Sequence, residues 1–91
     1  MSSQVAMIVK LMPSSPDVDL KEIEGIAKTT LESNGAQNIS FEEKPVAFGL
    51  NAIYIKFAWP EEKSTDMVES VLSEIENVSS VSIEDYRRAF G

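Results

Sequence analysis

The sequence predicts an α+β fold in which a four-stranded antiparallel sheet carries two helices on one of its faces. Apolar residues alternate with period two in four segments and recur with the helical period in two others. These segments follow the order strand, helix, strand and then strand, helix, strand again. Right-handed crossovers then place the first and third strands at the centre of the sheet. This is the ferredoxin-like β-α-β-β-α-β sandwich, and a length of 91 residues suits one domain, residues 1–91.

The first half of the chain supplies a strand, a helix and a second strand. Gln4 to Met12 alternates with apolar residues on both faces, which is typical of a central strand. A helix is expected to begin after Asp19 as its N-cap and to end at Asn34, where the following glycine provides a left-handed stop. Ala36 to Lys44 is the second strand, and its polar residues favour a position at the edge of the sheet.

The second half of the chain repeats this order. Leu50 to Trp59 is the clearest strand pattern in the sequence. Ser64 begins a sequence that caps a second helix running to about Glu76. Val78 to Tyr86 is the last strand, and Arg87 to Gly91 is a tail. The expected core consists of Ile8, Val9, Ile23, Leu31, Ile53, Ile55, Phe57, Val71 and Leu72.

The turn between the second and third strands contains an unusual residue. Phe48 is a large apolar side chain where turns usually carry small or polar residues. Pro45 cannot donate a hydrogen bond to the sheet, so pairing should stop there. Gly49 tolerates backbone angles that Phe48 would resist. Two interpretations are open: Phe48 folds back onto the core, or it is an exposed anchor for a partner.

The composition excludes several classes of function. The chain has no cysteine and no histidine, which excludes disulfides and thiolate sites and removes the commonest general base. Fifteen acidic against eight basic residues give a net charge of −7, which disfavours direct nucleic-acid binding and suits a basic protein partner. No apolar run approaches the roughly 20 residues of a membrane span, and no signal peptide is recognisable. We therefore expect a cytoplasmic protein without membrane association.

No catalytic or metal-binding constellation assembles from the sequence. The acidic pairs Glu42-Glu43 and Glu61-Glu62 could be metal ligands or an acid/base pair. Adjacent residues of a strand point to opposite faces, however, and exposed loop carboxylates are usually only solvated. No glycine-rich phosphate-binding loop is present. We therefore expect no catalytic residue, no bound metal and no cofactor.

Three stretches of the chain resemble the archaeal elongation factor 1-beta family. They are Met12 to Leu20, Pro45 to Leu50 and Val81 to Arg88, in this order and at matching spacing. The resemblance covers nearly the whole chain. It implies a guanine-nucleotide exchange factor, not an enzyme, that acts on elongation factor 1-alpha, the GTPase that delivers aminoacyl-tRNA to the ribosome.

The same resemblance implies where the partner binds. In eukaryotic relatives a phenylalanine of this turn enters a pocket on the GTPase, and Phe48 matches it. A lysine near the C-terminus of those relatives reaches toward the magnesium site, whereas the matching residue here is Arg88, with three residues after it. A planar guanidinium is not equivalent to a compact ammonium, so the resemblance implies binding rather than magnesium displacement. The expected partner-binding residues are Ala47, Phe48, Gly49, Tyr86, Arg87 and Arg88.

Two alternatives follow from the residues alone. A domain of this fold could be a small-molecule-sensing or protein-binding regulatory module. It could also be an enzyme that uses Lys10, Tyr54 and Lys56 on the open face of the sheet, although the sequence indicates no base to accompany them.

Overall fold

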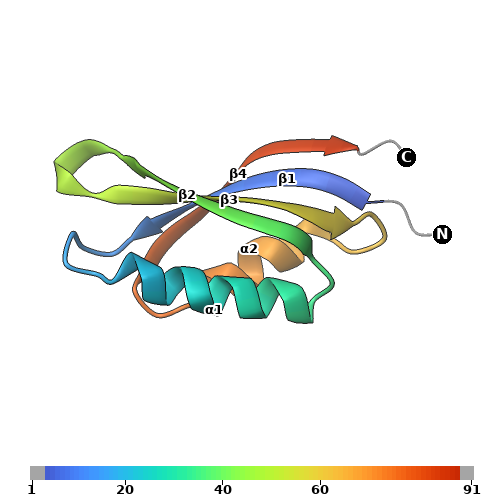
Figure 1. The fold of residues 1–91 in the computed structure, drawn as a ribbon, viewed down its shortest axis with the longest axis horizontal. Helices are drawn as coiled ribbons and strands as arrows, with labels where there is room; N and C mark the ends of the chain where they lie inside the picture. The colour runs from blue at the N-terminus through green and yellow to red at the C-terminus, as the bar shows by residue number, and fades with distance from the viewer. Residues whose placement is uncertain (1–3, 89–91) are drawn as a thin grey trace.

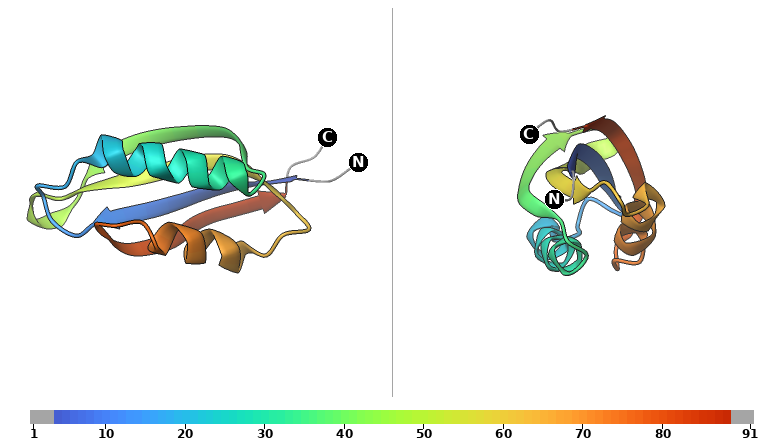
Figure 2. Two further views of the ribbon diagram at one scale, coloured as in Figure 1. Left: turned by 90° about the horizontal axis from the view of Figure 1, so that it is seen from below. Right: turned by 90° about the vertical axis from the view of Figure 1, so that its right-hand side faces the viewer.

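A four-stranded sheet with two helices on one face forms the molecule (Figure 1). The computed structural model describes residues 4–88, and of Arg88 only the backbone. The elements are β1 (Gln4–Pro13), α1 (Leu20–Ser33), β2 (Gln37–Pro45), the 3₁₀ turn η1 (Ala47–Gly49), β3 (Asn51–Pro60), α2 (Thr65–Ser73) and β4 (Val78–Arg88). The strand order is β2-β3-β1-β4 and all neighbours are antiparallel. Figure 2 shows both helices on the same side of the sheet. The predicted fold and its central strands are confirmed.

The two central strands bury alternate side chains beneath the helices, as their patterns predict. These are Val5, Met7, Val9 and Leu11 of β1 and Ile53, Ile55, Phe57 and Trp59 of β3, each at most 4% exposed. The expectation that Ile8 is a core residue is wrong. Ile8 pairs with Lys56 on the opposite face, where no helix covers it, and it is only half-buried. Val71 of α2 is also only half-buried.

Helix α1 begins and ends as predicted. The Asp19 carboxylate accepts a hydrogen bond from the backbone N–H of Lys21 at 3.0 Å, which caps the first turn. At the other end Gly35 has φ +98°, and the N–H of Ala36 donates to the carbonyl of Leu31 at 3.0 Å. This closes a Schellman motif, with Leu31 and Ala36 both buried.

Helix α2 is shorter than predicted. Ser64 caps it through a 3.1 Å bond from the N–H of Asp66 to the serine hydroxyl, as expected. The helix ends at Ser73 rather than near Glu76. Asn77 has φ +73°, so the chain turns sharply here to enter β4, and a continued helix would be incompatible with that turn.

Strand β4 is longer than predicted. Arg87 pairs with Ala6 and Arg88 with Val5, so both arginines belong to the sheet rather than to a tail. The strand continues because the backbone of β1 at Val5 and Ala6 is available for pairing. The alternation of apolar residues within β4 gives no sign of this. The remaining expected tail, Ala89 to Gly91, lies outside the described residues. Within residues 4–88, neither helix is long and apolar enough to cross a bilayer.

Candidate functional site

Phe48 is exposed to solvent at the tip of the β2–β3 hairpin. Its side chain is 92% exposed, so the interpretation that it folds back onto the core is wrong. Its backbone has φ 62° and ψ 29°, the left-handed region that bulky residues rarely adopt. Phe48 thus adopts the angles that its residue type resists, instead of leaving them to Gly49 alone. Gly49 adopts φ +74°, as its residue type allows.

The turn that carries Phe48 is closed by two backbone hydrogen bonds. The N–H of Val46 donates to the carbonyl of Leu50 at 2.8 Å, and the N–H of Leu50 donates to the carbonyl of Ala47 at 3.3 Å. Strand pairing stops at Pro45, opposite Asn51, as predicted. The left-handed conformation of a non-glycine residue costs about 1–2 kcal/mol. These closing bonds hold the ring in solvent despite that cost, which favours an anchor for a partner.

The other expected partner-binding residues lie at the end of β4. Tyr86 is 46% exposed and pairs with Met7, which places it on the face that carries the helices. Arg87 pairs with Ala6 and therefore lies on the open face. The Arg87 Nε lies 3.1 Å from the Asp85 carboxylate. The side chain of Arg88 is not described.

These two groups of residues do not form one site. The molecule is 43 Å along its longest axis, and the turn with Phe48 and the C-terminal end of β4 occupy its opposite ends (Figure 1). The strand order already implies this, because β2 and β4 run in opposite directions within the sheet. A partner that contacts both groups must therefore extend along the sheet.

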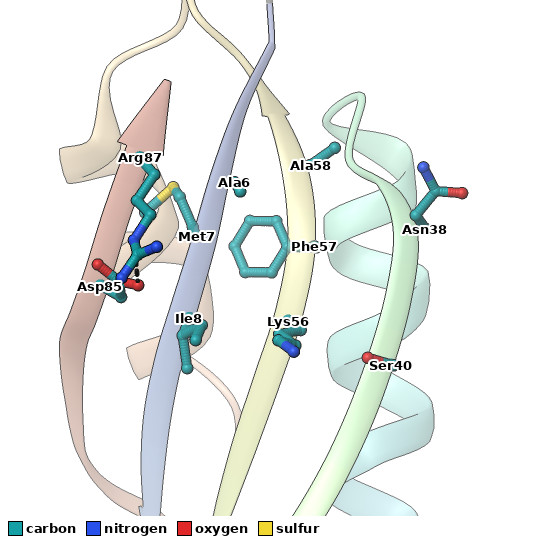
Figure 3. Close-up of a pocket in the computed structure, with 10 residues that line it drawn as sticks. All are labelled: Ala6, Met7, Ile8, Asn38, Ser40, Lys56, Phe57, Ala58, Asp85 and Arg87. Carbon is teal, nitrogen blue, oxygen red and sulfur yellow. Dashed lines mark ion pairs between the residues drawn. The ribbon is translucent and has the colours of Figure 1, made fainter. Parts of the chain in front are cut away.

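Between the two ends, the open face of the sheet contains a hollow that the sequence did not reveal. Its volume is about 560 Å³. Figure 3 shows Ala6 and Ala58 beneath it, Asp85 and Arg87 on the β4 side, and Asn38 and Ser40 on the β2 side. Asn38 has φ 56° within an irregularity of β2, where the register shifts between Gln37 and Ser40. The one signal in the sequence is the pair of small residues on the uncovered sides of β1 and β3.

Comparison with known proteins identifies the family. Residues 6–89 match the family model described as the EF-1 guanine nucleotide exchange domain. The chain belongs to this family. It is 34% identical to Elongation factor 1-beta of Methanosphaera stadtmanae, over 94% of this chain and 97% of that protein. It is 36% identical to the Halobacterium salinarum protein of the same name (94% and 98%) and 38% identical to that of Ignicoccus hospitalis (93% and 92%). The resemblance inferred from the three stretches is confirmed.

This exchange domain has no metal-binding cluster among residues 4–88, since no three acidic side chains there could hold an ion. Glu42 and Glu43 separate as adjacent strand residues should. Glu42 lies 3.3 Å from Lys44, whereas Glu43 lies 3.4 Å from Lys21 of α1. These acidic neighbours are therefore held in surface ion pairs on different sides of the strand.

Glu43 also faces Glu24, which α1 holds against the sheet. The Glu24 side chain is only 12% exposed, and its Oε2 is buried without a hydrogen-bond partner among the described residues. Burial raises the pKa of Glu24 above its ordinary value of 4.5, despite Lys21 at 3.7 Å. Glu24 can donate a hydrogen bond to Glu43 once it is protonated, and this favours the charged form of Glu43 and lowers its pKa. Glu24 is thus the member of the pair that takes up a proton first.

Replacing Glu24 by glutamine should raise the melting temperature at pH 7. The amide can donate to Glu43 the hydrogen bond that a charged carboxylate cannot, and one such bond contributes about 1 kcal/mol. A raised pKa in the folded state means that wild-type stability increases as the pH falls toward that pKa. The difference between Glu24→Gln and wild type should therefore shrink from pH 7 to pH 4. Melts across this range test it, with the exposed Glu69→Gln as a control of equal charge change. If the difference in melting temperature does not depend on pH, Glu24 does not take up a proton in this range and the prediction is wrong.

Proposed function

We propose that this domain is a guanine-nucleotide exchange factor that promotes GDP release and GTP reloading on elongation factor 1-alpha during translation elongation. The observation that carries the proposal is the exposed Phe48 on a closed, left-handed turn in a chain of the exchange-domain family. The role is binding rather than the making or breaking of bonds. Phe48 is the apolar anchor, and the end of β4 supplies the charged contact.

The energetics of such a factor follow from linkage. A partner that binds the nucleotide-free GTPase more tightly than the GDP-bound form weakens nucleotide binding by the same coupling free energy. A coupling of about 3 kcal/mol corresponds to roughly 150-fold weaker GDP binding. The domain must therefore bind a conformation that the GTPase adopts poorly when GDP is present.

Two contacts at opposite ends of a rigid sheet suit this task. When the domain contacts the GTPase at two separated points, its affinity depends on the distance between the two contact points on the GTPase. Phe48 lies in the closed turn between β2 and β3, and Arg87 lies on β4 of the same sheet, so the fold sets their spacing. A GTPase conformation that matches this spacing is favoured, and the conformation that does not match is disfavoured.

The direct test is release of labelled GDP from the cognate elongation factor 1-alpha. With saturating domain, the GDP affinity should fall by about 5- to 150-fold and release should accelerate. An unrelated acidic protein of similar size serves as the control for non-specific charge effects. GDP release that is equally slow with and without the domain would refute the proposed function.

A further inference from the structure

The open face of the sheet contains a groove made of two connected hollows. The 560 Å³ hollow over Ala6 and Ala58 adjoins a second one of about 290 Å³, and the two share Ile8, Ser40 and Lys56. The second hollow extends to Tyr54 and Lys44, toward the turn of Phe48. We call this continuous surface the open-face groove. The floor of the larger hollow is apolar, because Ala6 and Ala58 pair directly across β1 and β3 beside the half-buried Ile8.

Among the described residues 4–88, the charges along the groove leave one cation without an ion-pair partner. Glu42 and Asp85 are the acidic residues that line it, and each is paired, at 3.3 Å from Lys44 and 3.1 Å from Arg87. Lys56 lines both hollows, and Figure 3 shows it on β3, apart from the Asp85–Arg87 pair on β4. It is exposed and makes no ion pair with any residue between 4 and 88. The groove therefore offers an ammonium that no described side chain pairs, beside an apolar floor.

The opposite layer of the molecule has the reverse charge. The two helical segments, residues 19–34 and 64–77, contain eight carboxylates and two lysines. Both helices lie on the side of the sheet away from the groove (Figure 2). An acidic partner would be repelled by the helical layer and accepted by the open face. Charge thus selects which face such a partner can approach.

We propose that the open-face groove docks an acidic segment of the GTPase, with a carboxylate at Lys56 and an adjacent apolar side chain over Ala6 and Ala58. The inference rests on the proposed function, since the GTPase is its occupant. Continuity supports that choice of occupant. The groove is lined by Arg87 at one end and by Lys44, next to the Phe48 turn, at the other. A partner that reaches from Phe48 to Arg87 along the open face crosses it.

Lys56→Glu tests the charge of the groove. The substitution places a carboxylate where the partner's carboxylate should lie, and like charges repel. We expect binding to the nucleotide-free GTPase to weaken by at least 10-fold and stimulated GDP release to fall accordingly. Lys28→Glu makes the same charge change on the exposed side of α1 and should leave both within about twofold of wild type.

Ala58→Trp tests the apolar floor without a change of charge. The indole would fill the hollow and exclude the partner's side chain, so GDP release should again fall by at least 10-fold. This effect should persist at high salt, whereas that of Lys56→Glu should diminish. Ser70→Trp on the exposed surface of α2 is the matched control and should remain active. Melting curves of all variants establish that each is folded.

The outcomes separate the two proposals. If wild-type protein does not accelerate GDP release, the proposed function itself fails. If wild type accelerates release and both groove variants match it, the docking inference is overturned while the function stands. If only Lys56→Glu is impaired and added salt removes its defect, Lys56 acts by long-range steering, and docking in the groove is likewise overturned. Impairment of both variants, with both controls active, supports docking.

Discussion

Phe48→Ala is expected to lower stimulated GDP release by about 10-fold or more while leaving the melting temperature nearly unchanged. Truncating a central aromatic anchor typically costs 2 kcal/mol or more of binding free energy. The folded domain itself loses little, because the ring is 92% exposed. Alanine also keeps the left-handed strain at this position, since that strain comes from the Cβ atom. Melting curves and GDP release measured on one preparation test both parts.

Phe48→Gly is the companion variant that separates the ring from its backbone. Glycine adopts the observed φ of 62° without steric cost, so stability should rise by up to about 1 kcal/mol. Exchange should fall as far as in Phe48→Ala, because the ring is equally absent. Activity and stability would then change in opposite directions. A stability loss of several kcal/mol with normal exchange per folded molecule would refute the anchor role.

The helices and strands could be predicted because the sequence pattern within each segment is enough to define it. Alternation in β1 and β3, the Asp19 cap and the Gly35 stop each define an element without reference to the rest of the chain. The errors fall where distant residues decide. β4 extends to Arg88 because β1 offers backbone partners there, and α2 stops at Ser73 because the chain must turn at Asn77. Neither cause is visible in the local pattern.

The candidate site was predictable only in part. A phenylalanine in a turn bounded by Pro45 and Gly49 marks an unusual position, but composition does not reveal that Phe48 itself is left-handed. The open-face groove depends on the register that brings Ala6 opposite Ala58, and register is a property of the assembled sheet. Lys56 becomes notable only when its neighbours are seen to be paired with one another.

The largest expected effect on stability is that of Ile55→Ala. Ile55 lies at the centre of β3, is fully buried, and faces Val9 of β1 and Phe41 of β2 across the sheet. Removing three carbon atoms from such a site costs the transfer free energy of those atoms and leaves a cavity, about 2–5 kcal/mol together. A domain of this size has a total stability of about 5–15 kcal/mol. The variant should therefore lose a large fraction of its free energy of unfolding but still contain enough folded protein to be measured.

Urea titration measures this loss directly, as a lower midpoint with an unchanged slope. Ile55→Val removes one carbon and should cost about 0.5–1.5 kcal/mol. Ile26→Ala is the matched control, since the same side chain is 42% exposed on α1 and alanine has the better helix propensity. Its stability should stay within about 0.5 kcal/mol of wild type or rise. Because Ile55 lies on the helix side of the sheet, opposite the open-face groove, exchange per folded molecule should be normal. If Ile55→Ala and Ile26→Ala cost the same, the core does not lie between β3 and the helices.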